Sequence, residues 1–329
     1  MYICKMENEI STAMKTDVLY IVVPCFNEQE VLPVTTPRLL QQLSLLQQDH
    51  LVDEHSRILY VDDGSTDDTW ALIDRHCREH DRVCGVKLAG NVGHQNALVA
   101  GMTVARERAD IIVTIDADLQ DDVSVIGQMV ERYRQGCDIV YGVRRERKSD
   151  TWFKRNTALA FYRLMQRLGV KSVYNHADYR LMSRRAVNQL LQYRERNLFL
   201  RGIVPLVGYR SEKVYYDRGE RLAGESKYPL GKMMSFAVDG ITSFSIKPVR
   251  MVLTLGVVFT LIALVMLAYV LVAYFGGRTV SGWSSLILSL WFIGGCVLIG
   301  LGIVGEYIGK IYIEVKDRPR YNIEQEVIH

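Results

Sequence analysis

Two aspartates of this chain have the type and spacing expected of ligands for a divalent cation. Asp116 and Asp118 stand on alternate residues directly after the apolar run at residues 111–115. If that run is a buried strand, the two carboxylates lie at its carboxyl end, where open α/β sheets bind ligands. Mg²⁺ is typically held in proteins by one or two carboxylates together with substrate phosphates. A surface Asp-x-Asp turn would have the same sequence, so the pair alone leaves both interpretations open.

The elements that must position this pair follow from the pattern of residues 17–145. Short β-rich runs alternate there with helical patterns, which predicts an α/β fold with a mostly parallel sheet flanked by helices. We expect strands at 18–23, 57–61, 83–88, 111–115 and 138–143. We expect one helix at 36–48. A second should begin at a cap at Ser65 or Thr66 and continue through Ile73, and a third should follow the loop at 90–96 and end at Arg106. Successive strand ends then deliver Asp, Asn and Gly to one edge of the sheet.

Two loops at that edge suit a nucleotide. Asp62, after the second strand, could accept hydrogen bonds from a ribose or a base, and Gly-Asn-Val-Gly at residues 90–93 offers backbone N–H groups for close ligand approach. The chain has neither a G-K-[ST] phosphate loop nor the G-x-G-x-x-G dinucleotide fingerprint here. Each motif alone is more often an ordinary turn, so their order along the chain is the informative feature.

Composition bounds the class of protein. The 329 residues are 49% hydrophobic with a net charge of +3, which fits one large globular domain plus a further segment and does not suggest a nucleic-acid partner. The six cysteines are scattered without a C-x-x-C pair, so we expect reduced thiols facing the cytosol. Residues 1–16 lack a continuous apolar run and predict an N-terminal tail rather than a signal peptide.

The C-terminal quarter predicts a membrane hairpin. Residues 251–277 and 279–305 carry no charge and are separated by Arg278 alone. A helix of that length spans roughly 40 Å, enough to cross a hydrocarbon core of about 30 Å. A buried helical hairpin of a soluble protein is the alternative, and two such long uncharged stretches disfavour it. Residues 231–248 have an amphipathic pattern that predicts an interfacial helix leading to the first span, and residues 152–167 have a similar basic, aromatic pattern.

Positive charge flanks the predicted hairpin. Lys247 and Arg250 precede it and four basic residues lie between 310 and 320, so the positive-inside rule places both ends in the cytoplasm. The Gly305-x-x-x-Gly309 spacing permits close approach of helices, within the hairpin or between protomers. On this spacing we expect a homo-oligomer bound to the lipid bilayer.

The ordered motifs resemble those of a known family. They are Pro-Cys-Phe-Asn-Glu at 24–28, Val-Asp-Asp-Gly-Ser at 61–65, Asn-Val-Gly at 91–93 and Asp-Ala-Asp-Leu-Gln at 116–120. This set resembles the signature of family 2 glycosyltransferases with the GT-A fold, a Rossmann-like sheet. Motifs at 178–181, 195–199, 224–228, 241–250 and 305–309 resemble polyprenyl-phosphate glycosyltransferases, most closely the bactoprenol glucosyltransferases. The resemblance covers residues 18–321. Cys25 departs from the usual Val or Tyr, and His94 and Gln95 occupy a variable part of the Asn-x-Gly loop.

The resemblance implies an inverting transfer of a sugar from a UDP-sugar to undecaprenyl phosphate at the cytoplasmic leaflet of the plasma membrane, with glucose as the first choice. It implies a donor site of Pro24, Asn27, Glu28, Asp62 and Gly93, with Asp116 and Asp118 holding Mg²⁺ or Mn²⁺ against the diphosphate and Gln120 close by. The cation would offset the charge that develops on the UDP leaving group.

The acceptor side depends on different residues. A phosphate monoester has a second pKa of about 6 and is mostly ionised at neutral pH, so it needs little help from a general base. The resemblance marks Asp178 as a base or as an acceptor-orienting residue. Arg144, Arg180, Arg201 and Lys227 are candidates for binding phosphates, and for each of them a solvated surface charge is an equal alternative.

Together, these patterns divide the chain into a tail (1–16), a cytoplasmic catalytic domain (17–230), an interfacial helix (231–250), two membrane spans (251–277 and 279–305) and a cytoplasmic C-terminal segment (306–329). Other donors with GlcNAc, galactose, mannose or an aminoarabinose derivative remain open. A processive polysaccharide synthase is disfavoured because the chain lacks a Q-x-x-R-W motif. From another class, a non-catalytic nucleotide-sugar-binding partner of a membrane flippase remains open.

Overall fold

The computed structural model describes residues 16–145, 176–195, 199–217 and 282–329, together with single positions between 249 and 276. Two compact units make up the chain. The first comprises Met1–Thr151, Ser172–Lys227 and Arg318–His329, and the second comprises Trp152–Lys171 and Tyr228–Asp317. Most of the predicted tail, most of the interfacial helix, the segment at 152–167 and Lys227 lie outside the described residues.

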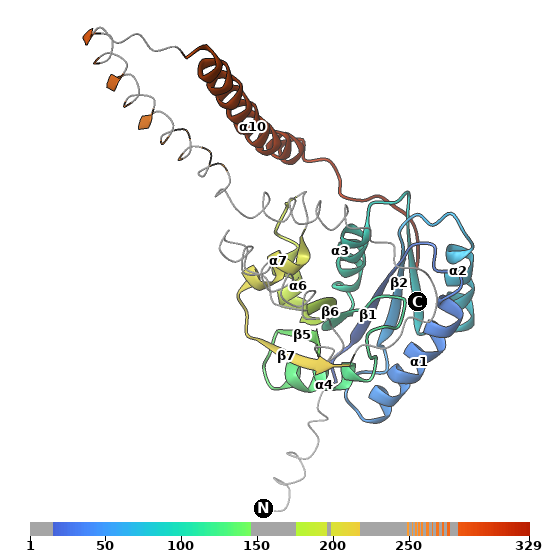
Figure 1. Cartoon of the computed structure of the whole chain (residues 1–329). Coiled ribbons are helices and arrows are strands. Elements are labelled where there is room, and N and C mark those ends of the chain that lie inside the picture. Colours follow the sequence, from blue (N-terminus) through green and yellow to red (C-terminus); the bar gives the residue numbers. More distant parts are fainter. Residues whose placement is uncertain are drawn as a thin grey trace, which may run out of the picture. The chain divides into compact units, whose positions relative to one another are not determined.

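The first unit is built on one sheet with the strand order β7-β5-β6-β4-β1-β2-β3-β8 (Figure 1). Its strands are β1 (Leu19–Cys25), β2 (Arg57–Asp62), β3 (Val83–Leu88), β4 (Ile111–Thr114), β5 (Ile139–Arg144), β6 (His176–Ser183), β7 (Ser211–Tyr216) and β8 (Ile323–Val327). β4, β1, β2 and β3 run parallel, whereas β6 lies antiparallel between β4 and β5, and β8 lies antiparallel to β3. The predicted mostly parallel α/β sheet is confirmed, with two antiparallel additions.

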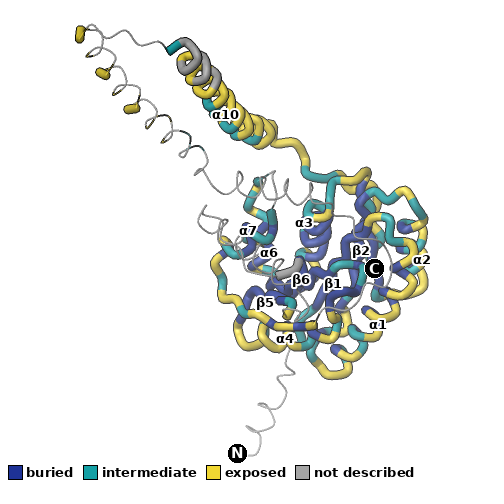
Figure 2. Tube along the Cα trace, viewed as in Figure 1, coloured by how far each residue is buried: buried dark blue, intermediate teal, exposed yellow. Residues whose placement is uncertain are grey.

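The central strands read as apolar runs because they are covered on both faces. All residues of β1 are buried, as expected for a strand in the middle of a parallel sheet. Figure 2 shows this buried layer in dark blue beneath a more exposed helical surface. Gly101 lets helix α3 (His94–Ala105) approach the sheet closely, because a Cβ at this position would lie 2.4 Å from Val22 Cγ1. Because α3 follows the parallel strand β3 along the chain, its start lies at the carboxyl ends of the strands.

The other helices of this unit are α1 (Leu32–Gln48), α2 (Thr69–Glu79), α4 (Val125–Arg134), α6 (Arg184–Leu190) and α7 (Leu200–Ile203), with a 3₁₀ turn at Val204–Val207. α1 begins earlier than predicted because a proline is tolerated in the first turn of a helix. The predicted cap of α2 is wrong. That helix begins at Thr69, and Ser65 belongs to the preceding turn, where its N–H donates to Asp62 and its hydroxyl accepts from the Asn27 N–H.

The second unit contains helix α10 (Trp283–Val315). It begins and ends later than the predicted span at 279–305. It extends beyond the last uncharged residue because Glu306, Lys310 and Glu314 are good helix formers. Glu306 and Lys310 pair one turn apart at 3.8 Å. Among the described residues one helical stretch is long and apolar enough to cross a membrane, Phe292–Val315, with a mean hydropathy of 1.8. The two-span hairpin stays a prediction.

Candidate active site at the carboxyl edge of the sheet

The Asp116–Asp118 pair lies in the loop that follows β4, at the carboxyl edge of the sheet as predicted. The loop is held to α1 by a hydrogen bond from the Thr35 hydroxyl to the Ala117 carbonyl at 2.7 Å. Asp118 Oδ1 accepts the Gln120 N–H at 3.2 Å, and Gln120 itself is buried. Both predicted metal ligands therefore sit on an anchored turn.

The electrostatics of this loop favour a bound cation. Burial raises the pKa of Asp116 to about 6, and the carboxylates of Asp121, Asp178 and Asp118 add to the rise against a lowering effect of His94. Carboxylates that crowd together disfavour one another's ionised form, and a cation placed between them relieves that repulsion. The arrangement can therefore hold a hard divalent ion through oxygen ligands.

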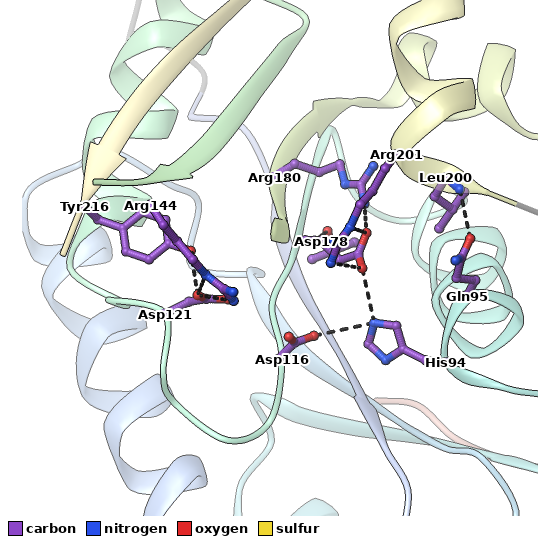
Figure 3. A network of polar contacts seen from close by, with 11 residues as sticks. His94, Gln95, Asp116, Asp121, Arg144, Asp178, Arg180, Leu200, Arg201 and Tyr216 are labelled. Carbon is purple, nitrogen blue, oxygen red and sulfur yellow. Dashed lines mark hydrogen bonds and ion pairs between the residues drawn. The ribbon is translucent and has the colours of Figure 1, made fainter. Parts of the chain in front are cut away.

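A second cluster surrounds Asp178 on β6. Asp178 and Arg180 stand two residues apart, so they lie on the same face of the strand, and the Arg180 guanidinium bonds one carboxylate oxygen (Figure 3). Arg201, from α7, donates to the other oxygen at 3.1 Å. Burial raises the pKa of Asp178, but the Arg201 and Arg180 charges outweigh it and hold the pKa below its usual range. A carboxylate held in this way is a weak base, which favours an orienting role over proton abstraction.

The predicted phosphate ligands occupy different environments. Arg180 is only 2% exposed and is committed to Asp178, whereas Arg201 is 44% exposed. Arg144 Nη2 donates to Asp121 Oδ1 at 3.0 Å, and the same oxygen accepts from the Tyr216 hydroxyl. Asp121, Arg144 and Tyr216 form a separate group beside the acidic loop in Figure 3. Arg201 is thus the most accessible cation of the three described candidates that border Asp178 or the acidic loop.

His94 joins the two acidic centres, and sequence reasoning missed it. Its Nε2 lies 3.5 Å from Asp116 Oδ1 and 3.8 Å from Asp178 Oδ2, as the dashed lines in Figure 3 show. It is the first residue of α3, directly after Gly93, whose φ of +89° favours glycine. A histidine at a helix start beside a glycine turn was the available signal. The imidazole is placed to contact groups bound between Asp116 and Asp178.

Gln95, also unassigned by sequence reasoning, connects α3 to α7. Its Oε1 accepts the Leu200 backbone N–H at 2.8 Å, which supplies a tertiary cap to the start of α7. Arg201 is the next residue of α7, so this bond fixes the helix that presents the guanidinium to Asp178.

The predicted nucleoside residues border one another. Asp62 is fully buried, its Oδ1 accepts the Ser65 N–H, and its Oδ2 has no hydrogen-bond partner among the described residues. Burial raises the pKa of this carboxyl. A buried acceptor oxygen without a partner is costly, so Asp62 Oδ2 is suited to accept a hydrogen bond from a ligand.

The loop after β1 is bonded to the loop after β2. Asn27, in the left-handed region at φ 54°, accepts the Thr66 N–H at 2.9 Å, and the Glu28 N–H donates to the Thr69 hydroxyl at 2.8 Å. Pro24 belongs to β1. These contacts hold two of the predicted donor-site motifs, at 24–28 and 61–65, side by side at the edge of the sheet.

Asp63 organises the Asn-Val-Gly loop, a role that sequence reasoning did not assign. Its two carboxylate oxygens accept the backbone N–H groups of Val92 and Gly93, at 2.8 and 3.0 Å. The Gly93 N–H that the sequence offered to a ligand is therefore engaged within the protein. The loop places His94 instead of presenting these two amides.

A mostly parallel α/β sheet with an Asp-x-Asp turn and buried acidic groups at its carboxyl edge is the architecture of GT-A glycosyltransferases. Residues 20–191 match the family profile described as glycosyl transferase family 2. The chain belongs to this family, and it is a glycosyltransferase.

Similar proteins cover nearly the whole chain. It is 55% identical over 307 residues to the uncharacterized glycosyltransferase YkoT of Bacillus subtilis, covering 93% of this chain and 91% of that protein. It is 38% identical over 309 residues to the bactoprenol glucosyl transferase of Shigella phage SfII, covering 93% and 97% of the two chains. A solved mannosyltransferase of Pyrobaculum calidifontis, in complex with GDP-Man and Mn²⁺, matches 96% of this chain and 92% of its own at 14% identity with a TM-score of 0.45.

Proposed function

We propose that this glycosyltransferase transfers glucose from UDP-glucose to undecaprenyl phosphate, with inversion, on the cytoplasmic side of a membrane to which α10 anchors it. The observation that carries the proposal is the convergence of the Asp116–Asp118 loop and the Asp178–Arg201 cluster on one sheet edge, joined by His94. A relative 38% identical over nearly its full length is named a bactoprenol glucosyl transferase, which supports both the sugar and the lipid acceptor.

The donor side uses the residues of the loops after β1 and β2. Asp62 would accept a hydrogen bond from the uracil or ribose, and Asn27 and Glu28 hold the adjoining wall in place. Pro24 and Gln120 complete the donor site in this proposal. Burial of Asp62 makes an unsatisfied acceptor there costly, which favours binding of a nucleoside that donates to it.

Asp116 and Asp118 fit Mg²⁺ or Mn²⁺, because they offer carboxylate oxygens from one turn and because burial, with a further contribution from the neighbouring carboxylates, raises the pKa of Asp116 in the absence of a cation. A bound ion would supply Lewis-acid stabilisation of the departing diphosphate. Asp121 is paired with the Arg144 charge and accepts a hydrogen bond from the Tyr216 hydroxyl, so we assign it to the support of the loop.

The acceptor side uses Arg201 and His94. An ionised phosphate oxygen of the acceptor attacks the anomeric carbon, the bond from that carbon to the UDP oxygen breaks, and UDP leaves with the electron pair. Arg201 is 44% exposed and can contact the acceptor phosphate while Asp178 fixes its orientation. Arg180 neutralises Asp178 from the buried side and does not reach substrate in this proposal.

The test is transfer by the purified full chain, incubated in detergent with undecaprenyl phosphate, Mg²⁺ and a panel of labelled UDP-sugars, followed by extraction of the lipid. We expect UDP-glucose to label the lipid and the product to have the opposite anomeric configuration to the donor. Labelling by UDP-GlcNAc or UDP-galactose instead would replace glucose but keep the reaction. UDP binding without a lipid product from any donor would overturn the proposal in favour of a nucleotide-sugar-binding partner.

A further inference from the structure

A group of potential metal ligands lies outside the candidate active site, at the end of α2. His76 and Glu79 belong to the last turn of this helix and His80 follows it directly, in a His-x-x-Glu-His sequence. Side chains three and four residues apart share one face of a helix. One ligand atom from each of the three residues lies within 4.8 Å of the other two. The two imidazole rings are stacked, with centroids 6.4 Å apart.

His76 is the least exposed member of this group, and its ring nitrogens are buried. The His76 side chain is 15% exposed, and within the described part of the chain neither of its ring nitrogens has a partner. Its Nδ1 lies 3.9 Å from Glu79 Oε2, which is too long for a hydrogen bond. Buried polar atoms are normally paired. The unpaired imidazole of His76 lies beside the Glu79 carboxylate and the His80 imidazole, and all three groups can donate an electron pair. A metal cation is a partner that all three could share.

We propose that His76, Glu79 and His80 bind a transition-metal ion of the Zn²⁺ class, at a site separate from the catalytic loop. Two imidazoles and one carboxylate suit Zn²⁺, whereas Mg²⁺ prefers oxygen ligands alone. Bonds of about 2.0–2.1 Å in a tetrahedral site place the ligand atoms about 3.4 Å apart. The side chains of Glu79 and His80 are on the exposed side and can rotate to close the present spacing.

The position of the site suggests what the ion would do. The turn after His80 leads into β3, which pairs with the C-terminal strand β8 at Gly85 and Val327. His329 Nε2 donates to the Cys77 carbonyl of α2 at 2.9 Å. A metal that joins the end of α2 to His80 would brace the corner against which the C-terminal strand packs. Binding to the folded state alone stabilises that state by mass action.

The test is a Zn²⁺ titration of the full chain, purified without a histidine tag and freed of metal with a chelator. The D116N/D118N double variant serves as the background, because it removes the carboxylates of the catalytic loop that would also take up Zn²⁺. In this background we expect one Zn²⁺ per chain, no competition by Mg²⁺, and a rise in the thermal unfolding midpoint on adding Zn²⁺. Co²⁺ in place of Zn²⁺ should give the visible absorption bands of a four-coordinate site.

Two variants of exposed ligands, His80→Asn and Glu79→Gln, should each weaken Zn²⁺ binding by about tenfold or more, on the scale of effects seen when a group supporting a metal site is removed. His55→Ala, which removes an exposed histidine from another loop, is the matched control and should bind as tightly as the background. An affinity equal to that of the background in both ligand variants, or no Zn²⁺ bound by the background, would overturn the proposal. None of these measurements involves sugar transfer, so a negative result for the metal site would be distinct from a failure of the proposed function.

Discussion

His94 Nε2 lies 3.5 Å from the Oδ1 atom of Asp116, and the same nitrogen is 3.8 Å from Asp178 Oδ2. The two carboxylates come from different parts of the sheet, one from the turn after β4 and the other from β6. One imidazole therefore contacts both the proposed metal turn and the proposed acceptor centre. The start of α3 therefore lies at the candidate site, although its sequence falls in a variable portion of the family motif.

We predict that His94→Ala lowers kcat for sugar transfer by about tenfold, equivalent to about 1.4 kcal/mol of transition-state stabilisation. The reason is the loss of a group that contacts both acidic centres. His94→Gln retains a hydrogen-bond donor and should keep more of the rate than the alanine variant. Transfer assays at saturating donor and acceptor measure both. Unchanged kcat in His94→Ala would show that the imidazole serves neither centre.

Asp116 gives a prediction about stability and pH. Its pKa in the folded chain, about 6, lies above the ordinary value of 3.8, so the ionised form is disfavoured by folding. The native state therefore loses stability from this group as the pH rises through that interval. Asp116→Asn should raise the unfolding midpoint of the metal-free protein at about pH 7.5, and the gain should shrink toward about pH 4, because the folded state keeps its proton there and the unfolded state is already partly protonated. Thermal unfolding at the two pH values measures this difference.

The same variant should lose transfer activity at both pH values, because the amide is a poorer ligand for a hard cation than a carboxylate. A variant that gains stability while it loses activity is expected if the ionised Asp116 carboxylate destabilises the metal-free fold but is needed to bind the cation. Asp74→Asn, in α2, removes one negative charge that is paired with Arg78 and serves as the control, because it should not show the pH-dependent gain. An Asp116→Asn chain that is less stable than wild type at neutral pH would contradict this account of the acidic loop.

Much of the sheet could be predicted because its central strands are apolar runs that end in turns with Asp and Gly. This pattern can be recognised in the local sequence without knowledge of the packing. β8 could not be predicted. Its sequence Ile-Glu-Gln-Glu-Val is mostly exposed, and it becomes a strand by pairing with the edge of β3, which is a tertiary effect. The contacts of His94 and Gln95 were hidden for a similar reason. They depend on how closely α3 packs at Gly101 and on where α7 lies, and the local sequence predicts neither.

The two arginines at Asp178 should respond differently to substitution. Arg201 is partly exposed and is proposed to contact the acceptor, so Arg201→Ala should raise KM for undecaprenyl phosphate with little loss of stability. Arg180 is buried, and Arg180→Ala removes a charge from a buried pair, which costs about 3–5 kcal/mol in comparable cases. Urea unfolding and acceptor titrations separate these effects. A larger stability loss in Arg201→Ala than in Arg180→Ala would reverse the assigned roles.

Gln95 is predicted to act through Arg201. Gln95→Ala removes the acceptor for the Leu200 N–H, so the start of α7 loses its tertiary cap and the guanidinium of Arg201 is less well placed. KM for the acceptor should rise while KM for UDP-glucose stays near the wild-type value. Gln95→Glu keeps an acceptor oxygen and should restore the acceptor KM toward that of wild type. Equal changes in both KM values would indicate a general structural defect instead of a positioning role.

Asp63 gives the last prediction, because one side chain fixes the loop that delivers His94. Its carboxylate accepts two backbone N–H groups, from Val92 and Gly93. Asp63→Asn presents an amide NH₂ to one of these donors, so one hydrogen bond is lost and a partly buried N–H is left unpaired, at a cost of about 1–3 kcal/mol. Denaturant unfolding should show that loss, and kcat should fall with it because His94 is displaced. Asp68→Asn removes an exposed charge from the same region and should change neither quantity. If Asp63→Asn lost stability but kept full kcat, the loop would be a structural support without influence on the site.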